Sequence, residues 1–295
     1  MALENKIVVN LWYTTMYFAV KNTFKHLRRL AVAGLLSFGF VWLAGCELYS
    51  QSMENSAGDN YFSDMIVTRL VHTVQDAIVA HDSGMNMGHA AVMTFSSVPG
   101  EKKMEMRYGV DYVTDYDGFE RKGTVTTTWD RSFFIPGSTM HIVMENEHGT
   151  NGWATKGFID VTNWGLNEWD QPMYEVRCSL ELISPAYNWE WTNEYIRVKI
   201  SRDSTPQSTD DLWSVTGTAY ARNRQGRYYN ALIKDSLYYS PRCKYGYTRG
   251  KVDIQHVDAT QRLFVVYGEG TDTACSQYMT FDRGKRKLTV TKNLK

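Results

Sequence analysis

From Gly84 to the end of the chain, apolar and polar residues alternate in short segments, and this alternation constrains the fold more than any other feature. Alternation with a period of two residues is typical of strands that bury one face. Dipeptides that favour tight turns separate the segments: Asp117-Gly118, Pro136-Gly137, Asn151-Gly152, Gln225-Gly226 and Arg283-Gly284. Short strands joined by tight turns predict a mainly β, antiparallel domain, arranged as a meander, a sandwich or a barrel.

The alternation places the expected strands at intervals through residues 85–295, which we take as one β-rich domain. The long polar loop at residues 202–211 is a candidate boundary within it. The strands are expected at residues 104–113, 123–129, 140–145, 157–163, 173–183, 195–200, 212–220, 228–237, 250–256, 262–267, 277–281 and 287–292.

Residues 61–84 differ from the rest, because their apolar side chains recur with a helical period. The residues that recur every fourth position are Phe62, Ile66, Leu70, Val74 and Ile78. The polar residues Asp64, Arg69, Gln75 and Asp76 lie off this stripe. The spacing predicts one amphipathic helix that docks its apolar stripe on a sheet. Membrane contact is disfavoured, because the polar face is not basic.

The N-terminal segment has the organisation of a secretory signal peptide. A basic cluster (residues 21–29) precedes an apolar run (residues 30–42), which ends in Leu43-Ala44-Gly45-Cys46. This ending resembles the lipobox of bacterial lipoprotein precursors, which implies that residues 1–45 are removed and that Cys46 is lipidated. A membrane span is the alternative, but residues 30–45 are fewer than the roughly 20 that a span needs. Met16 is an alternative start of translation, and residues 46–60 are expected to form a flexible tether.

The charge balance argues against a nucleic-acid partner. The chain has 32 basic and 32 acidic residues. The first 46 residues contain more basic than acidic side chains, so the remaining chain is slightly acidic. Binding to nucleic acid requires clustered Lys and Arg to neutralise phosphates. Residues 47–295 are enough for one large all-β domain or two small ones.

The other three cysteines are interpreted in the light of export, which permits disulfides. Cys178 falls on the apolar face of an expected strand and is interpreted as a buried free thiol. Cys243 and Cys275 are the expected disulfide pair. Closing their loop of about 33 residues would stabilise the fold by roughly 3.5 kcal/mol in the chain-entropy treatment. Zinc is the alternative, although neither cysteine has another cysteine or histidine at ligand spacing.

A series of short motifs resembles uncharacterised lipoproteins of the Bacteroidetes phylum over nearly the whole mature chain. They are Tyr108-Gly109, Asp117-Gly118, Arg121, Gly123, Pro136-Gly137-Ser138, residues 157–163, Val215, Gly217, Ala219, Cys243, Gly250, Tyr267, Gly270 and Cys275. The resemblance implies a lipid anchor and a β-rich fold, and it implies no catalytic residue. This chain departs from the group in the longer spacing between Gly270 and Cys275, which leaves the disulfide open.

One cluster has the composition of a metal site. His81, Met85, Met87 and His89 combine imidazole and thioether groups, which suit Cu(I). The alternative is the end of a helix, where His81 interacts with the helix dipole and Gly84 terminates the helix. The segment from Asp115 to Gly118 suggests calcium, but it lacks the further ligands of an EF-type loop and is more simply a hairpin turn.

A second cluster has the composition of a sugar site. Tyr187, Trp189 and Trp191 share one face of a strand and lie beside amide and carboxylate side chains. Exposed rings next to such groups can hold a sugar. The alternative is that the rings fill the core of the sheet, because aromatic residues bury large areas and favour strands.

The sequence contains no motif of a known hydrolase, metalloprotease or nucleotide-binding loop. Ser138 follows Pro136-Gly137 and is better explained as a turn residue than as a nucleophile. No cofactor is expected. We expect a lipid-anchored protein of the bacterial cell envelope, at the outer membrane, that binds a ligand or another envelope protein without catalysis. The alternatives are a carbohydrate-binding protein, a glycan hydrolase or a structural surface protein.

Overall fold

The computed structural model describes residues 51–84, 88–99, 101–133, 135–145, 148–201, 211–268, 275–284 and 286–292. The chain divides into two units, Met1–Gln51 and Ser52–Lys295, and the second unit is the domain considered below. The expected signal peptide (1–45), Cys46, Met85 and Met87 lie outside the described residues, as does nearly all of the expected boundary at 202–211.

Residues 51–83 form one helix, which is longer than expected at its N-terminal end. The expected tether (46–60) is therefore helical over residues 51–60. The cause is packing, because Met53 and Ala57 extend the apolar stripe and are 2% and 1% exposed. The helix ends at Gly84, which has a φ of 68° and donates its amide to the His81 carbonyl at 3.3 Å. A glycine in the left-handed conformation is a common helix end.

Antiparallel strands follow the helix and form one sheet. Each strand pairs with the next along the chain, except that β4 pairs with β6 and the short β5 pairs with β3 and β6. The strands are β1 (Val92–Val98), β2 (Glu101–Thr114), β3 (Glu120–Trp129), β4 (Thr139–Met144), β5 (Gly149–Thr150), β6 (Trp153–Leu166), β7 (Pro172–Ile183), β8 (Asn188–Lys199), β9 (Trp213–Arg222), β10 (Tyr228–Tyr239), β11 (Tyr247–His256), β12 (Arg262–Tyr267), β13 (Tyr278–Asp282) and β14 (Lys287–Thr291). The predicted fold class, a mainly β antiparallel domain preceded by one helix, is confirmed, and among the arrangements left open the structure has the meander.

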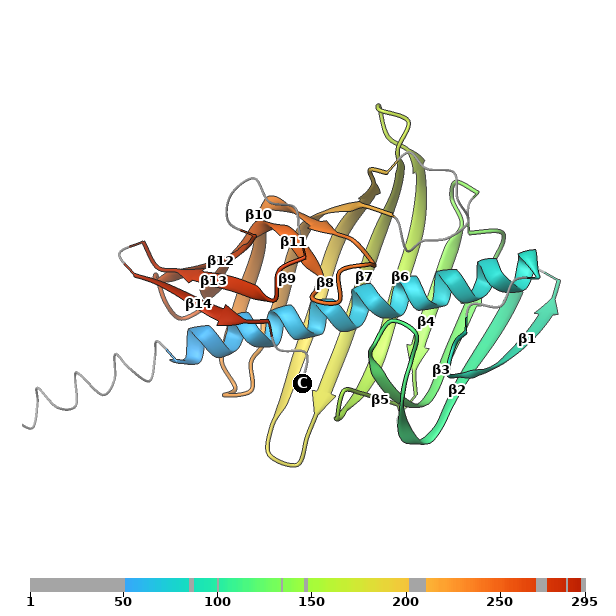
Figure 1. Cartoon of the computed structure of the whole chain (residues 1–295), viewed down its shortest axis with the longest axis horizontal. Coiled ribbons are helices and arrows are strands. Elements are labelled where there is room, and N and C mark those ends of the chain that lie inside the picture. Colours follow the sequence, from blue (N-terminus) through green and yellow to red (C-terminus); the bar gives the residue numbers. More distant parts are fainter. Residues whose placement is uncertain are drawn as a thin grey trace, which may run out of the picture. The chain divides into compact units, whose positions relative to one another are not determined.

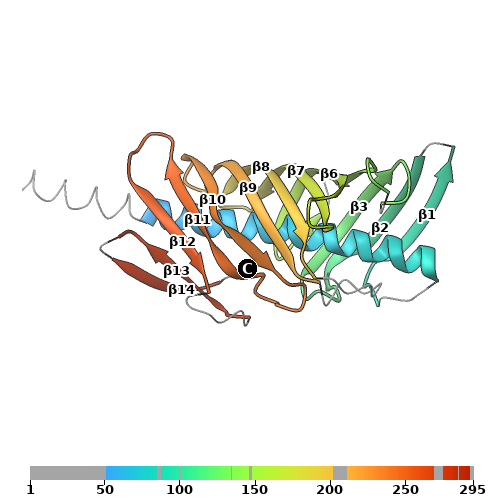
Figure 2. The same cartoon turned by 90° about the horizontal axis from the view of Figure 1, so that it is seen from above.

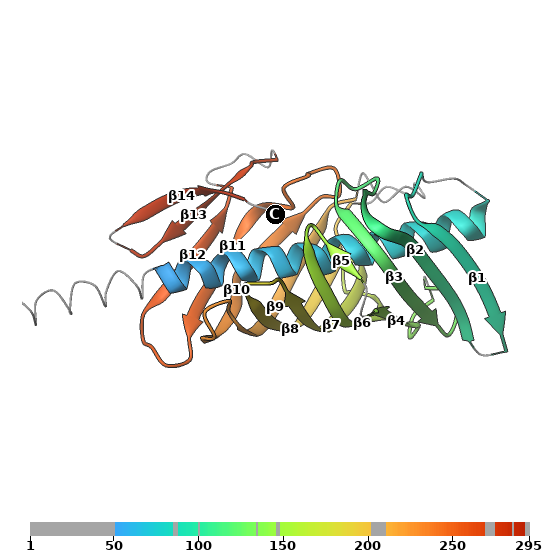
Figure 3. The ribbon, with the colours of Figure 1, turned by 90° about the horizontal axis from the view of Figure 1, so that it is seen from below.

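The sheet curves around the helix. In Figure 1 the strands follow one another along the helix, and Figures 2 and 3 show the same arrangement from above and below. Strands β12–β14 lie at the N-terminal part of the helix, and β1 and β2 lie at its C-terminal part. The helix therefore occupies the concave face of the sheet, and the other face of the sheet is the outer face.

The helix is buried on nearly all sides, which differs from the expected one-sided contact. Asp64, Arg69 and Asp76 are each 2–3% exposed, although they lie off the apolar stripe. Residues of the strands and of the loops between them supply partners for these polar groups. Tyr247 donates its hydroxyl to Asp64 at 2.8 Å, and Tyr116 donates its hydroxyl to Asp76 at 2.7 Å.

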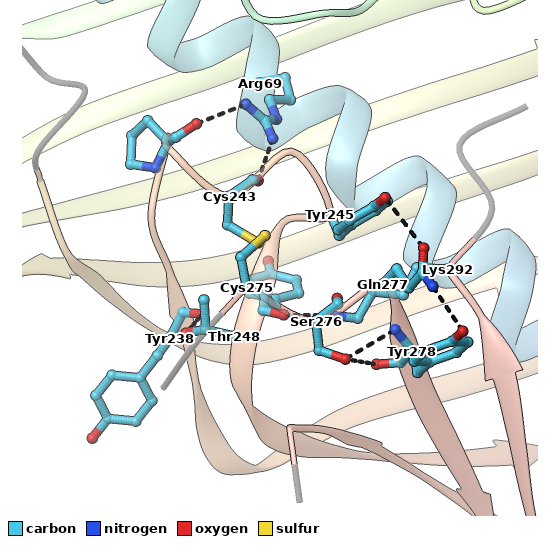
Figure 4. Close-up of a disulfide and its surroundings, with 12 residues drawn as sticks. Arg69, Tyr238, Cys243, Tyr245, Thr248, Cys275, Ser276, Gln277, Tyr278 and Lys292 are labelled. Atoms are coloured by element: carbon cyan, nitrogen blue, oxygen red, sulfur yellow. Dashed lines mark hydrogen bonds between the residues drawn. A yellow bond between two sulfur atoms is a disulfide. The ribbon is translucent and has the colours of Figure 1, made fainter. Parts of the chain in front are cut away.

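The expected disulfide is present. Cys243 and Cys275 are bonded, with their Cα atoms 5.2 Å apart, and Cys178 is a buried free thiol. Figure 4 shows that the loop carrying Cys243 also contacts the helix. Arg69 donates to the main-chain carbonyl oxygens of Pro241 and Cys243 at 3.1 and 2.6 Å. The disulfide and Arg69 therefore hold the loop between β10 and β11 from two sides.

Candidate ligand-binding surface

The two tryptophans of the expected sugar site belong to the core. Trp189 and Trp191 are 0% exposed. Their indole N–H groups donate to Ser63 Oγ and to Asn60 Oδ1 on the helix, both at 2.9 Å. Tyr187 lies at the surface and is half exposed. The core interpretation therefore holds for Trp189 and Trp191, whose rings face the helix and offer no exposed face to a sugar.

The expected copper ligands have different surroundings in the described structure. His81 is half exposed, and its ring stacks on Phe95 with centroids 3.8 Å apart. His89 lies edge-on to Tyr116, with Nδ1 3.8 Å from Asp115 Oδ1. Among the described residues, which exclude Met85 and Met87, no group of three or more His, Cys, Asp or Glu side chains is placed to hold a metal ion.

The acidic turn that suggested calcium contains a buried ion pair. Arg121 is 1% exposed and donates to both oxygens of Asp117, at 2.8 and 2.6 Å, and to Asp115 at 3.2 Å. Burial acts to raise the pKa of Asp117, but the charge and hydrogen bonds of Arg121, the hydrogen bond from the Phe119 amide and the charge of Arg69 together lower it. The guanidinium thus takes the place that a cation would occupy. Ser138 is a buried turn residue, whose hydroxyl donates to the Phe133 carbonyl at 3.0 Å.

The outer face of the sheet carries two adjoining hollows. The first has a volume of about 670 Å³ and lies over β4, β6, β7 and β8. The second has a volume of about 770 Å³ and lies over β6 to β10. Phe158 and Thr192 line both hollows, so the two form one groove, which we call the outer groove.

Aromatic rings are exposed in the outer groove. Phe158 is 40% exposed and Tyr220 is 47% exposed. Tyr220 stacks on Tyr228, with centroids 5.7 Å apart and planes at 14°. Pairing with Tyr228 holds the ring of Tyr220 in a fixed orientation, which lowers the entropy that a ligand would have to remove.

Paired polar and charged side chains also lie along the same groove. His141 Nδ1 lies 2.6 Å from Asp160 Oδ1, and Lys156 Nζ lies 2.8 Å from Glu181 Oε2. Arg222 donates to Glu190 at 2.7 Å. These side chains are between about one quarter and one half exposed. The groove therefore combines apolar ring faces with oriented donors and acceptors.

The sequence contains a signal for the outer groove that is independent of clustered aromatic residues. Phe158 alternates with the buried Ile159 and Val161, and Tyr220 alternates with the buried Ala219 and Ala221. Aromatic residues at the polar positions of an alternating strand point away from the core. Phe158 and Tyr220 are therefore identified by their outward-facing positions in the strands, and not by the number of aromatic residues nearby.

Comparisons with family models, with curated proteins and with solved structures found no match to this chain. Within the described residues, no helix is both long and apolar enough to cross a membrane.

Proposed function

We propose that this protein is a non-enzymatic binding component of the bacterial cell envelope, held at the outer membrane by a lipid on Cys46, and that its ligand is a glycan. The observation that carries the proposal is the outer groove, where two exposed rings lie among ion pairs along one continuous hollow. The lipid anchor rests on the sequence from the basic cluster to Cys46 and on the resemblance to Bacteroidetes lipoproteins.

An oligosaccharide matches the chemistry of the outer groove. A sugar ring has an apolar face of C–H groups, which packs on an aromatic ring, and a rim of hydroxyls, which both donate and accept hydrogen bonds. Phe158 and Tyr220 supply ring faces, and Glu190 and Thr192 supply acceptors beside them. The length of the groove, which spans strands β4 to β10, favours a chain of several sugar units over a single sugar.

The test is a binding titration of the purified full chain with a panel of envelope and dietary glycans. We expect one class of glycan to bind, and we expect the double variant Phe158→Ala, Tyr220→Ala to bind it at least about tenfold more weakly, because both stacking surfaces are lost. Trp164→Ala is the matched control, since Trp164 is an exposed ring on β6 that does not line the groove.

Three outcomes would contradict the proposal. Binding that the double variant retains would remove the outer groove as the site. Release of shorter sugars from the bound glycan would favour the hydrolase alternative. Failure of every glycan to bind, together with self-association of the chain, would favour a structural surface protein.

A further inference from the structure

A second pocket lies on the opposite side of the sheet, against the middle of the helix. Its volume is about 370 Å³, near the lower end of small-molecule sites. The helix contributes Arg69, His72 and Asp76 to its wall. The turn between β2 and β3 and the loop between β10 and β11 complete it, so the pocket draws on three separate parts of the chain. We call it the inner pocket.

Three buried side chains of the inner pocket each have a polar atom without a hydrogen-bond partner among the described residues. The atoms are Arg69 Nε, His72 Nδ1 and the Tyr239 hydroxyl oxygen. Arg69 and His72 are each 3% exposed, and Tyr239 is 0% exposed. Buried polar groups are nearly always paired, because leaving one unpaired is costly. Three such groups around one pocket point to a missing partner.

All three groups act as donors. Arg69 Nε carries a hydrogen at any ordinary pH. Burial raises the pKa of Tyr239, which keeps its hydroxyl protonated. Arg197 lies 2.8 Å from His72 Nε2, and because a guanidinium can only donate, Nε2 accepts. Burial and the Arg197 charge lower the pKa of His72 well below its usual value, so the ring is neutral and its hydrogen is on Nδ1.

The charges around the inner pocket favour an anion. Two carboxylates, Asp76 and Asp117, line the pocket together with three cations, Arg69, Arg242 and Lys244, and Asp117 is also paired with Arg121. Arg242 and Lys244 add two exposed positive charges on the loop between β10 and β11. Figure 4 shows Arg69 directed at this same loop, where two of its nitrogens bind main-chain carbonyls.

We propose that the inner pocket binds a small organic anion, a carboxylate or a phosphate ester, whose oxygens accept hydrogen bonds from Arg69, His72 and Tyr239. The unpaired donors require an acceptor, the volume admits a small molecule, and the exposed Arg242 and Lys244 attract negative charge to the opening. The inner pocket shares no lining residue with the outer groove, so the proposal of anion binding can be tested independently of glycan binding.

The test is a calorimetric titration of the purified full chain, at low ionic strength, with inorganic phosphate, with succinate and with glucose as the neutral control. We expect phosphate or succinate to bind and glucose not to bind. Binding of succinate would indicate a carboxylate ligand, and binding of phosphate would indicate a phosphate ester. Tyr239→Phe should weaken anion binding about tenfold, because it removes one donor to a charged acceptor. The double variant Arg242→Gln, Lys244→Gln should weaken it severalfold and reduce its dependence on salt.

Tyr229→Phe is the matched control. Tyr229 is another fully buried tyrosine of β10 whose hydroxyl has no partner among the described residues, and it does not line the inner pocket. Both substitutions remove an unpaired buried hydroxyl, so neither should lower the melting temperature of the free protein. Only Tyr239→Phe should change the affinity for the anion. Absence of binding by both anions would overturn the proposal, as would an affinity that Tyr239→Phe leaves unchanged.

Discussion

The carboxyl group of Asp64 lies on the helix in the centre of the core and is 2% exposed. Burial raises its pKa to about 7, although the hydrogen bond from Tyr247 and the charge of Arg197 act in the opposite direction. In the unfolded chain the same group has an ordinary pKa near 3.8. Between these two values the folded protein therefore holds a proton that the unfolded chain has lost.

This difference predicts a pH-dependent effect of Asp64→Asn. Because the folded pKa is the higher one, the contribution of Asp64 to the free energy of unfolding falls as the pH rises from about 4 to about 7. Asn keeps an acceptor for Tyr247 and cannot ionise. The variant should therefore differ least from the wild type near pH 4 and be more stable at pH 8. The expected gain is a few kcal/mol, because a shift of about three pKa units corresponds to roughly 4 kcal/mol. Urea unfolding at a series of pH values measures it.

Asp258→Asn is the control for Asp64→Asn. Asp258 lies at the surface and accepts hydrogen bonds from Arg227 at 2.8 and 2.7 Å, which lower its pKa. The contribution of Asp258 to the free energy of unfolding has the opposite pH dependence. A carboxyl whose pKa is lowered in the folded state stabilises the fold at pH values above its pKa in the unfolded chain, and this stabilisation is lost as the pH falls. Parallel pH profiles for the two variants would contradict the assignment of a raised pKa to Asp64.

At the scale of elements, the sequence predicts the positions of the strands and of the helix, because these depend on residues close together in the chain. The alternation locates most strands, and the helical period locates the helix. The polar surface of the helix could not be interpreted in the same way, because its partners are distant in sequence. Asn60 binds Trp191 and Ser63 binds Trp189, across 131 and 126 positions. A local pattern shows that these side chains are polar, and only the fold shows what pairs with them.

At Gly250 in β11, the main chains of β10 and β11 are too close to accommodate a side chain. The φ of Gly250 is 122°, and a Cβ atom there would lie 2.5 Å from the Ser236 carbonyl oxygen and 2.7 Å from a Leu237 methyl carbon. The pairing of β10 with β11 is irregular at this point, between Asp235 and Tyr238. The main chains approach closely where the sheet bends, so any side chain would have to force them apart.

Gly250→Ala should therefore destabilise the domain by about 3 kcal/mol, from backbone strain together with the clash. Gly226→Ala is the matched control. Gly226 also has a positive φ, of 78°, but nothing lies within 4 Å of an added Cβ, so only the conformational cost of about 1 kcal/mol applies. Urea unfolding of both variants measures the difference, and equal losses would show that the strands do not approach as closely as described.

At the scale of the whole molecule, the antiparallel β class could be predicted, but the choice among a meander, a sandwich and a barrel, and the curvature of the sheet around the helix, could not. Tight turns favour the pairing of consecutive strands without fixing how the sheet closes. The enclosure of the helix depends on contacts between distant segments. The inner pocket illustrates this, because Arg69, Tyr116 and Tyr239 come together only after the sheet has closed over the helix.

The four cysteines of the chain allow the fold and the proposed anchor to be tested together. Cys243 and Cys275 are bonded, Cys178 is buried and free, and we propose a lipid on the sulfur of Cys46. Burial raises the pKa of Cys178, which further suppresses its reactivity in the folded state. For protein purified from bacterial membranes, we expect no reactive thiol when folded, one in denaturant and three after reduction.

Each departure from this thiol count identifies one failed assignment. Two thiols in denaturant before reduction would show that Cys46 carries no lipid, whereas three would show that Cys243 and Cys275 are not bonded. Growth with labelled palmitate gives an independent measure of the anchor, since the wild-type chain should be labelled and Cys46→Ala should not. Cys178→Ala is the control that keeps the anchor and the disulfide and removes the one thiol expected in denaturant, so its count before reduction should fall to zero.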